Sequence, residues 1–210
     1  EVLEIATFRN DFDYADHRHP SRVEFGSIEL DARRRDFTVN ALYYDPKTQR
    51  ILDLVGGMED LKAKKLRAIG DAKARFTEDA LRLLRTVRFT VNLGFDLDPA
   101  TAEAARAKSR LITKISAERI CDELDRILGG PRPAEGLELL ESLDLLPKVL
   151  PEVQLLRKDP SAVAQEESAS EAEDGGGARV RLWKHVLRTL QRLRDPVPIP
   201  LPVDHEEDRD

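Results

Sequence analysis

From Thr77 onward, apolar residues recur every three or four positions, and this spacing limits the second half of the chain to packed helices. The clearest stripe consists of Ala80, Leu83, Leu84, Val87 and Val91. Residues at this spacing share one face of an α-helix, so they are expected to form its buried side. Thr77 is predicted to cap this helix, with Glu78 and Asp79 in the first turn, where acidic side chains suit the positive helix end. Gly94 is predicted to end it.

Further helices are predicted downstream. Asp98 and Pro99 supply an N-cap and a first-turn proline for a helix that reaches Lys108. Two more are expected at 116–128 and 133–143. Leucine dominates the apolar residues and aromatic residues make up only 5% of the chain, which favours helix packing over a β-sandwich or barrel.

The first seventy residues show no single period, and they predict a mixture of helices and strands. The expected elements are a strand at 1–8, a polar mobile loop at 10–20, a helix at 30–44, strands at 51–54 and 66–69, and a short helix at 58–63. The helix at 30–44 would place Asp36 and Asn40 on one face, because they are four residues apart. The fold class expected for the chain is therefore α+β.

The composition changes again near the C-terminal end. Residues 158–179 are rich in Ser, Ala, Glu and Gly without apolar periodicity, which predicts a disordered linker. Residues 180–210 are expected to form one helix and a loose acidic tail. The predicted organisation is thus a mixed unit at 1–70, a helical unit at 71–157, the linker and the tail.

The net charge of −6 comes mostly from that tail. Residues 1–158 carry 27 basic and 28 acidic side chains, whereas residues 62–88 carry nine basic and three acidic ones. A basic stretch of this kind can contact phosphate, although a solvated helix face is the commoner explanation of a charge run. No apolar run approaches the roughly 18 residues of a membrane span, and a single cysteine predicts a reducing, cytoplasmic compartment. Cys121 is expected to be buried and inert.

Two segments carry residues suited to nucleotide binding. Adjacent guanidiniums at Arg34 and Arg35 can clamp a polyphosphate, while Asp36 and Asn40 can hydrogen-bond a ribose or orient the clamp. Taken alone this signal is weak, since arginine-rich helix turns are usually solvated or paired with acids.

The second segment contains Asp79 and Arg82, three residues apart and expected on one helix face. A carboxylate acceptor beside a guanidinium donor can meet the hydrogen-bonding edge of a nucleobase. An ordinary surface ion pair is the simpler alternative for this spacing.

Together and in order, these segments resemble motifs of the class II tRNA nucleotidyltransferase (CCA-adding) and bacterial poly(A) polymerase family. The similar stretches are 4–9, resembling the strand after the catalytic loop; 34–41, the ribose- and phosphate-contacting motif; 70–76, the hinge; 78–85, the base-selecting helix; and 116–124, a neck-stabilising helix. The resemblance covers residues 1–153. It implies a polymerase β-like nucleotidyltransferase head at 1–70 and a helical neck and body at 71–157.

The resemblance also implies roles in base selection. Asp79 and Arg82 would select the base of CTP or ATP, and Arg85 would support their orientation. Arg75 would help the hinge to reposition the helix between additions of C and A. The implied partner is the 3′ end of tRNA.

Further roles concern the phosphates and the metal. Arg34 and Arg35 would approach the triphosphate, and Asp36 and Asn40 would bind ribose and phosphate. Glu4 would match a third acidic residue near two Mg²⁺ ions. The main Asp-x-Asp pair is expected upstream of Glu1, so the chain is interpreted as N-terminally truncated.

Several patterns are given less weight. Asp11-x-Asp13 and Asp96-x-Asp98 match the bare metal-binding pattern but lie in a loop and a helix connection. His17 and His19 are interpreted as polar loop residues rather than metal ligands, and His185 as structural or as the remnant of a phosphohydrolase motif. Two alternatives to CCA addition stay open: a poly(A) polymerase, which Leu42-Tyr43-Tyr44 would also suit, and a non-catalytic RNA-binding module.

We predict that this chain binds nucleotide weakly and does not polymerise, because no Asp-x-Asp pair in the expected context is present. The measurement is incorporation of labelled CTP and ATP into a tRNA lacking its 3′ end. Robust incorporation by the purified chain would contradict the prediction.

Overall fold

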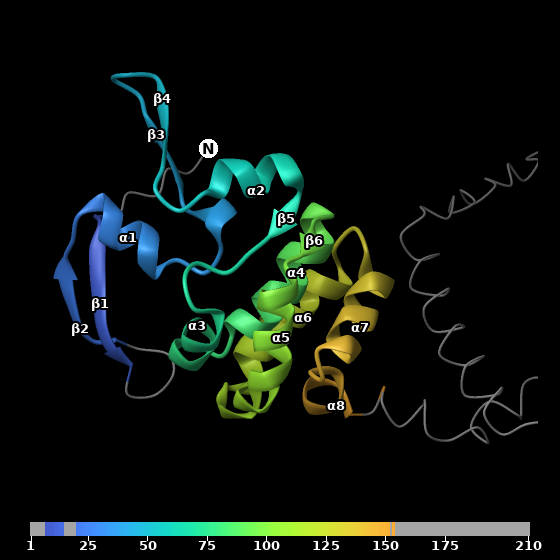
Figure 1. Cartoon of the computed structure of the whole chain (residues 1–210). Coiled ribbons are helices and arrows are strands. Elements are labelled where there is room, and N and C mark those ends of the chain that lie inside the picture. Colours follow the sequence, from blue (N-terminus) through green and yellow to red (C-terminus); the bar gives the residue numbers. More distant parts are fainter. Residues whose placement is uncertain (1–6, 15–19, 152, 154–210) are drawn as a thin grey trace, which may run out of the picture.

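The computed structural model describes residues 7–14, 20–151 and 153, and its elements confirm the predicted α+β class. Strands and short helices alternate up to residue 66, and helices dominate from Ala72 onward (Figure 1). Predictions for Glu4, His17, His19, the linker and the tail fall outside the described residues. No helix within these ranges is both long enough and apolar enough to span a membrane.

The first correction concerns the segment predicted as a loop. Strand β1 (Arg9–Tyr14) pairs antiparallel with β2 (Pro20–Phe25), with Arg9 opposite Phe25. The prediction relied on polar composition, but the hydrogen bonds between antiparallel strands are made by the backbone. Aromatic residues in the segment also favour a strand.

Helix α1 (Ile28–Arg34) is shorter than predicted. It starts at the N-cap Ser27 and ends at Arg34, so the predicted continuation to Tyr44 is wrong. Residues 36–38 instead bond to the segment 67–69: the Thr38 amide donates to the Arg67 carbonyl at 3.0 Å, and the Ile69 amide donates to the Asp36 carbonyl at 3.0 Å. These tertiary hydrogen bonds take the chain out of the helix, and two successive β-branched residues lower its helix propensity.

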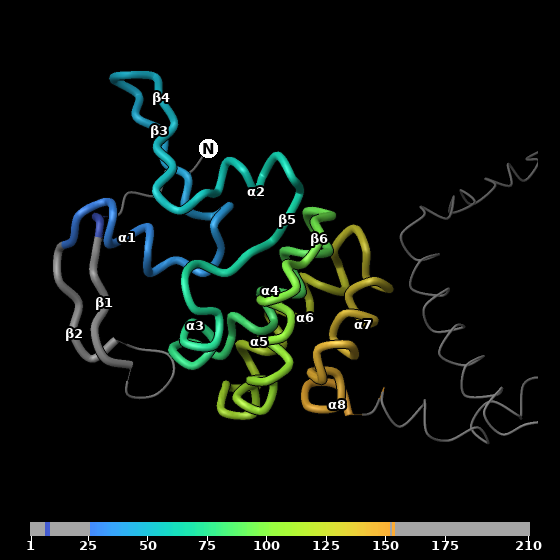
Figure 2. The backbone as a smooth tube through the Cα atoms, in the orientation of Figure 1, coloured from blue at the N-terminus to red at the C-terminus, as the bar shows by residue number. Residues whose placement is uncertain are grey.

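The chain then forms a projecting hairpin and returns. A 3₁₀ turn (Thr38–Asn40) leads into β3 (Leu42–Asp45), which pairs antiparallel with β4 (Arg50–Asp53). Helix α2 (Gly57–Ala63) and the short strand β5 (Lys65–Leu66) follow. The backbone path in Figure 2 shows the hairpin standing away from the rest of the chain, with α2 beside its base.

Helix α2 supports the turn that carries the site residues. A side chain at Gly57 would lie 2.3 Å from the Thr38 carbonyl oxygen, so only glycine allows this close approach. The Thr38 hydroxyl donates to the buried Asp60 carboxylate at 2.7 Å, and Asp60 also pairs with Arg67 at 2.9 Å. Residues 36–40 are therefore held from two directions.

The elements of the helical part are α3 (Ala72–Glu78), α4 (Arg82–Leu93), β6 (Asp96–Leu97), α5 (Pro99–Lys108), a 3₁₀ segment (Ser109–Lys114), α6 (Ala117–Leu128), α7 (Pro133–Ser142) and α8 (Leu146–Val149). The helices predicted at 99–108, 116–128 and 133–143 are confirmed, whereas β6, the 3₁₀ segment and α8 were not predicted. Gly94 ends α4 with a φ of 67°, as expected of a C-terminal glycine. Asp98 caps α5 through the Thr101 amide.

The junction between α3 and α4 corrects the predicted helix start. Thr77 lies inside α3, which is capped by Asp71, and Asp79 is the C-cap of α3 rather than a first-turn residue. Helix α4 begins only at Arg82. Phe76 and Ala80 are both buried, so the apolar pattern continues across the break. Apolar spacing alone therefore does not reveal the turn between the two helices.

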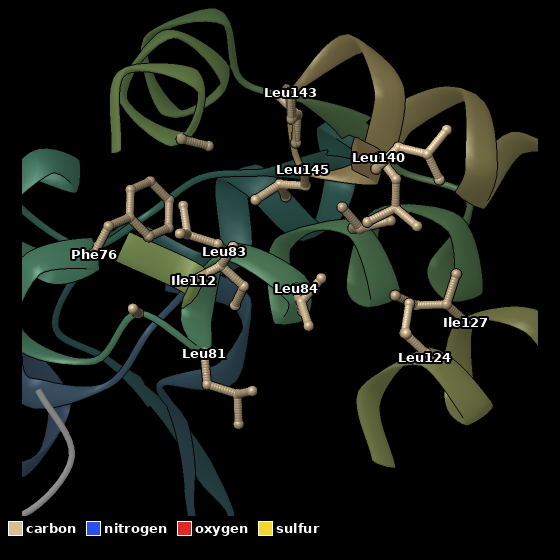
Figure 3. Packing of buried hydrophobic residues seen from close by; sticks show 14 of the residues in the cluster. Phe76, Leu81, Leu83, Leu84, Ile112, Leu124, Ile127, Leu140, Leu143 and Leu145 are labelled. Atoms are coloured by element: carbon tan, nitrogen blue, oxygen red, sulfur yellow. The ribbon is translucent and has the colours of Figure 1, made fainter. Parts of the chain in front are cut away.

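The predicted apolar stripe lies in the main core. Its five residues are buried and pack with residues of α6, α7 and the 3₁₀ segment (Figure 3). Helix α4 contacts both α6 and α7, and α3 contacts α5. Cys121 is exposed, which corrects the expected burial: positions 117, 121 and 125 share the outward face of α6, while Leu124 and Ile127 face inward.

We predict that Leu84→Ala lowers the free energy of unfolding by about 2–5 kcal/mol, because it leaves a cavity in the core. Leu84 is 0% exposed, whereas Leu93 on the same helix is 45% exposed. Leu93→Ala is the matched control and is expected to change stability by about 0.5 kcal/mol or less. Urea unfolding followed by circular dichroism measures both, and equal losses would contradict the packing described.

Candidate functional site

The two predicted site segments meet at one open cavity of about 580 Å³. It lies where the end of α1, the turn at 36–40, the α3–α4 junction and the start of α6 come together. The lining residues are Arg34, Arg35, Asp36, Asn40, Asp79, Leu81, Arg82, Arg85, Phe89 and Arg119. Five arginines against two aspartates give the lining a formal excess of positive charge, which favours an anionic ligand.

Asp36 organises one wall of this cavity. One carboxylate oxygen accepts from the Phe37 amide and the Asn40 side-chain amide, both at 2.9 Å. The other oxygen accepts from Arg85, with Nε at 2.7 Å and a terminal nitrogen at 2.6 Å. The predicted proximity of Asp36 and Asn40 is therefore confirmed, but a tight turn rather than a helix face produces it. In this arrangement Asp36 orients Asn40 and Arg85.

Asp31 holds the adjacent arginines. Its buried carboxylate accepts from Arg34 Nε at 2.9 Å, from Arg35 Nε at 3.2 Å and from the Tyr43 hydroxyl at 2.8 Å. Burial by itself raises the pKa of Asp31, but the hydrogen bonds from Tyr43 and Arg34 outweigh it and lower the pKa below its ordinary value. Burial and the bond to Asp31 raise the pKa of Tyr43. Asp31 was not among the predicted site residues, although its spacing to the two arginines is that of helical ion pairs.

Arg75 and Arg82 dock the helical part onto α1. Arg75 donates to the Arg33 carbonyl at 3.1 Å, and Arg82 donates to the Arg34 carbonyl at 2.8 Å. These two carbonyls belong to the last turn of α1, where no intrahelical donor is available and positive charge is favoured. Arg82 also donates to the Arg75 carbonyl and to Glu78, and its side chain is 10% exposed. Arg75 is not among the residues that line the cavity.

Asp79 reaches the cavity from the α3–α4 junction. One of its oxygens accepts from the Leu81 amide at 3.1 Å, and the other lies 3.5 Å from a terminal nitrogen of Arg119. Asp79 and Arg82 both line the cavity, but they do so from a turn and a helix start instead of one helix face. Arg119 was predicted only as part of a neck-stabilising segment, so its place in the site is new.

Phe89 forms the aromatic part of the lining and was also missed. Its ring lies 5.2 Å from the Arg85 guanidinium carbon and 4.4 Å from that of Arg88. It also makes an edge-to-face contact with Phe37, with 5.7 Å between the ring centroids. Behind it, Arg88 pairs with the buried Glu123 at 3.3 Å, which fixes α4 against α6. An aromatic position four residues after Arg85 was the available signal.

The described residues offer no metal site of the expected kind. They contain no group of three or more His, Cys, Asp or Glu side chains that could hold a metal ion. Glu4 lies outside these residues, and Asp98 is engaged as the cap of α5. The described residues therefore do not fit a Mg²⁺ site, and the binding of Mg²⁺ stays a prediction from the family resemblance.

Two family descriptions match the sequence. "Poly A polymerase head domain" matches residues 1–67, and "Probable RNA and SrmB- binding site of polymerase A" matches residues 94–156. The two matches flank the α3–α4 junction. Four lining residues of the cavity fall in the first match, one falls in the second, and the other five lie between the two matches.

Individual proteins similar to this chain are consistent with these two family descriptions. A CCA-adding enzyme of Streptococcus pyogenes serotype M5 (strain Manfredo) is 47% identical over 148 residues, which are 69% of this chain and 37% of that protein. A Bacillus stearothermophilus CCA-adding enzyme, solved in complex with CTP, is 30% identical with a TM-score of 0.62, covering 90% of this chain and 49% of that one. A tRNA-processing enzyme solved with CTP is 28% identical with a TM-score of 0.55, covering 79% and 51%. The chain spans 37% of the length of the curated relatives and about half of the solved ones.

We predict that Asp31→Asn destabilises the fold by about 1–3 kcal/mol at pH 7, since it removes the charged acceptor of three buried or half-buried donors. Because the pKa of Asp31 is lowered by folding, its contribution is present above the ordinary carboxyl value of 3.8 and is lost as the pH falls further. Urea unfolding of both proteins from pH 7 to pH 3 is the measurement.

The difference between wild type and Asp31→Asn is expected to shrink below about pH 4. The exposed Asp125→Asn on α6 serves as the control and is expected to show no such gap. A gap that stays constant down to pH 3 would contradict the assigned role of Asp31.

Proposed function

Because this chain belongs to the class II tRNA nucleotidyltransferase and bacterial poly(A) polymerase family, we propose that its cavity binds the nucleoside triphosphate used for template-independent addition to an RNA 3′ end. The observation that carries the proposal is the convergence of five arginines and the Asp79 carboxylate on one cavity. The relatives solved with CTP support a nucleotide as its occupant. The tRNA acceptor end is the proposed RNA, and the solved relative named as a tRNA-processing enzyme supports a tRNA substrate.

The charged groups divide the proposed site into two ends. Arg34, Arg35 and Arg85 are held by buried carboxylates yet remain partly exposed, so they can face the triphosphate without losing their partners. Guanidiniums fixed in this way bind phosphate oxygens through paired hydrogen bonds. Asn40, oriented by Asp36, adds a polar group beside them and can contact the ribose.

Asp79 is proposed to recognise the base. Its outer oxygen can accept from the exocyclic amino group of cytosine or adenine, and uracil and guanine present a carbonyl oxygen at the corresponding place. Arg82 is the other proposed base contact. Its guanidinium serves three acceptors through its two terminal nitrogens. Because a guanidinium carries five N–H donors, Arg82 can contact a base while it keeps these three partners.

In the proposed reaction, the RNA 3′-hydroxyl oxygen forms a bond to the α-phosphorus and its proton passes to solvent. The bond from that phosphorus to the bridging oxygen breaks, and pyrophosphate leaves with its electron pair. The part of this chain's residues is to bind the triphosphate, to hold it in a fixed direction and to offset its negative charge. The described residues supply no ligand set for Mg²⁺, and no step is assigned to the metal.

Poly(A) addition is the second candidate, because the family description that matches residues 1–67 names a poly(A) polymerase. A poly(A) polymerase would select ATP, whereas a CCA-adding enzyme must accept CTP as well. A non-catalytic RNA-binding module, the third possibility, would bind RNA with no dependence on either nucleotide. Equilibrium binding of each nucleotide therefore separates the three.

We predict that the wild-type chain binds CTP and ATP more tightly than UTP and GTP, and that Asp79→Asn lowers this preference by about tenfold. The substituted amide is expected to keep its oxygen on the Leu81 amide and to turn its NH₂ group toward the base, where it opposes an amino donor. Isothermal titration with the four nucleotides measures the preference.

Asp122→Asn, an exposed change on α6, is the matched control and is expected to leave all four affinities unchanged. Equal affinity of the wild-type chain for all four nucleotides would contradict base recognition at Asp79. Preference for ATP alone would favour poly(A) addition.

A further inference from the structure

Arg119 stands at an electrostatically unfavourable place. It is the third residue of α6 (Ala117–Leu128), and positive charge is disfavoured near the positive end of a helix. Among the residues that line the cavity, it alone comes from α6. Its guanidinium pairs with the Asp79 carboxylate across the cavity. The position of this arginine therefore favours the site at the expense of the helix.

The contact between Arg119 and Asp79 is weak by its geometry. The nitrogen and oxygen are 3.5 Å apart, at the outer limit of a hydrogen bond, and each side chain is 21% exposed. Partly exposed ion pairs contribute little to stability. The direction of Asp79 is set independently, because its other oxygen accepts from the Leu81 amide within the same turn. Arg119 can therefore leave Asp79 without disordering it.

The other charged contacts in the cavity are of a different kind. Arg85 approaches Asp36 with two nitrogens within 2.7 Å, and Arg82 serves three acceptors with its side chain 10% exposed. Displacing either arginine would leave several buried groups without partners, at considerable cost. Of the ion pairs in the cavity, the one between Arg119 and Asp79 is the one that a ligand can exchange.

We propose that Arg119 is a positioning residue that acts as the exchangeable counter-ion of Asp79. An incoming base can displace Arg119 only if the base itself donates a hydrogen bond to the Asp79 carboxylate. The inference rests on the proposed function. Cytosine and adenine can donate this hydrogen bond with their exocyclic amino groups, whereas uracil has a carbonyl oxygen there and cannot. Each amino-bearing base must then displace Arg119, so this residue reduces the margin by which CTP and ATP are preferred over UTP and eases their release.

The test is isothermal titration of CTP, ATP and UTP into the full chain and its variants. Arg119→Ala is expected to raise the ratio of CTP to UTP affinity by about two- to fivefold, the size expected for losing a weak, partly exposed ion pair. The ratio is used because losing one positive charge weakens the binding of all three triphosphates alike. Arg119→Lys keeps the charge and is expected to stay close to the wild-type ratio.

Two further variants complete the design. Arg119→Gln removes the charge with less loss of side-chain volume, and it is expected to give the same rise if Arg119→Ala fails to fold. Arg126→Ala is the matched control, because Arg126 lies on the same helix, is 61% exposed and does not line the cavity. It is expected to leave the ratio unchanged.

A ratio that stays constant or falls in Arg119→Ala and Arg119→Gln, while the wild-type chain binds CTP, would overturn this inference and leave the proposed function standing. A rise of equal size in Arg119→Lys or in Arg126→Ala would overturn it as well. A wild-type chain that binds neither CTP nor ATP would overturn the proposed function, and this inference with it.

Discussion

The site depends on how the helical part docks onto the end of α1. Arg75 and Arg82 donate to the Arg33 and Arg34 carbonyls, which are the last carbonyls of that helix. A helix end offers unpaired acceptors and a partial negative charge, so two guanidiniums satisfy it well. This docking brings α4 beside the turn at 36–40, and the cavity forms between them. Without it, the phosphate-facing and base-facing residues would belong to two unrelated surfaces.

Buried carboxylates compensate the positive charge of the closely spaced arginines. Asp31 accepts from Arg34 and Arg35, and Asp36 accepts from Arg85. Each carboxylate offsets the repulsion between guanidiniums and fixes their directions, while part of each guanidinium remains accessible. Buried ion pairs of this kind add little to stability compared with apolar packing. Their presence is better explained by the need for a fixed, positively charged lining in the cavity.

The helices of the second half were predicted well because the apolar spacing and the capping residues of the sequence indicate the same helices. The stripe from Ala80 to Val91 is buried, and Gly94 and Asp98 end and begin helices as expected. Prediction failed where tertiary hydrogen bonds override local preference. The segment 36–38 leaves the helix for the backbone of 67–69, and β1 forms from residues whose polarity suggested a loop. Seven of the nine residues named from the sequence line the candidate cavity, whereas Arg75 does not line it and Glu4 lies outside the described residues.

What could not be predicted was how those residues are used. Spacing alone placed Asp79 and Arg82 on one helix face, yet a turn separates them and Arg82 is occupied in capping α1. Arg119 enters the site through a tertiary contact with Asp79 that no local pattern contains. Asp31 and Phe89 do have arginines three or four residues away, but spacing alone did not show that these pairs face the cavity. The α3–α4 turn was also not predicted, because buried apolar residues continue across it.

The most direct test of the central claim is a crystal structure of this chain with CTP bound. We expect the triphosphate to lie against Arg34, Arg35 and Arg85. The cytosine amino group is expected within hydrogen-bonding distance of Asp79, with Arg119 turned away from that carboxylate. A nucleotide bound outside the cavity, or one whose base points away from Asp79, would contradict this expectation.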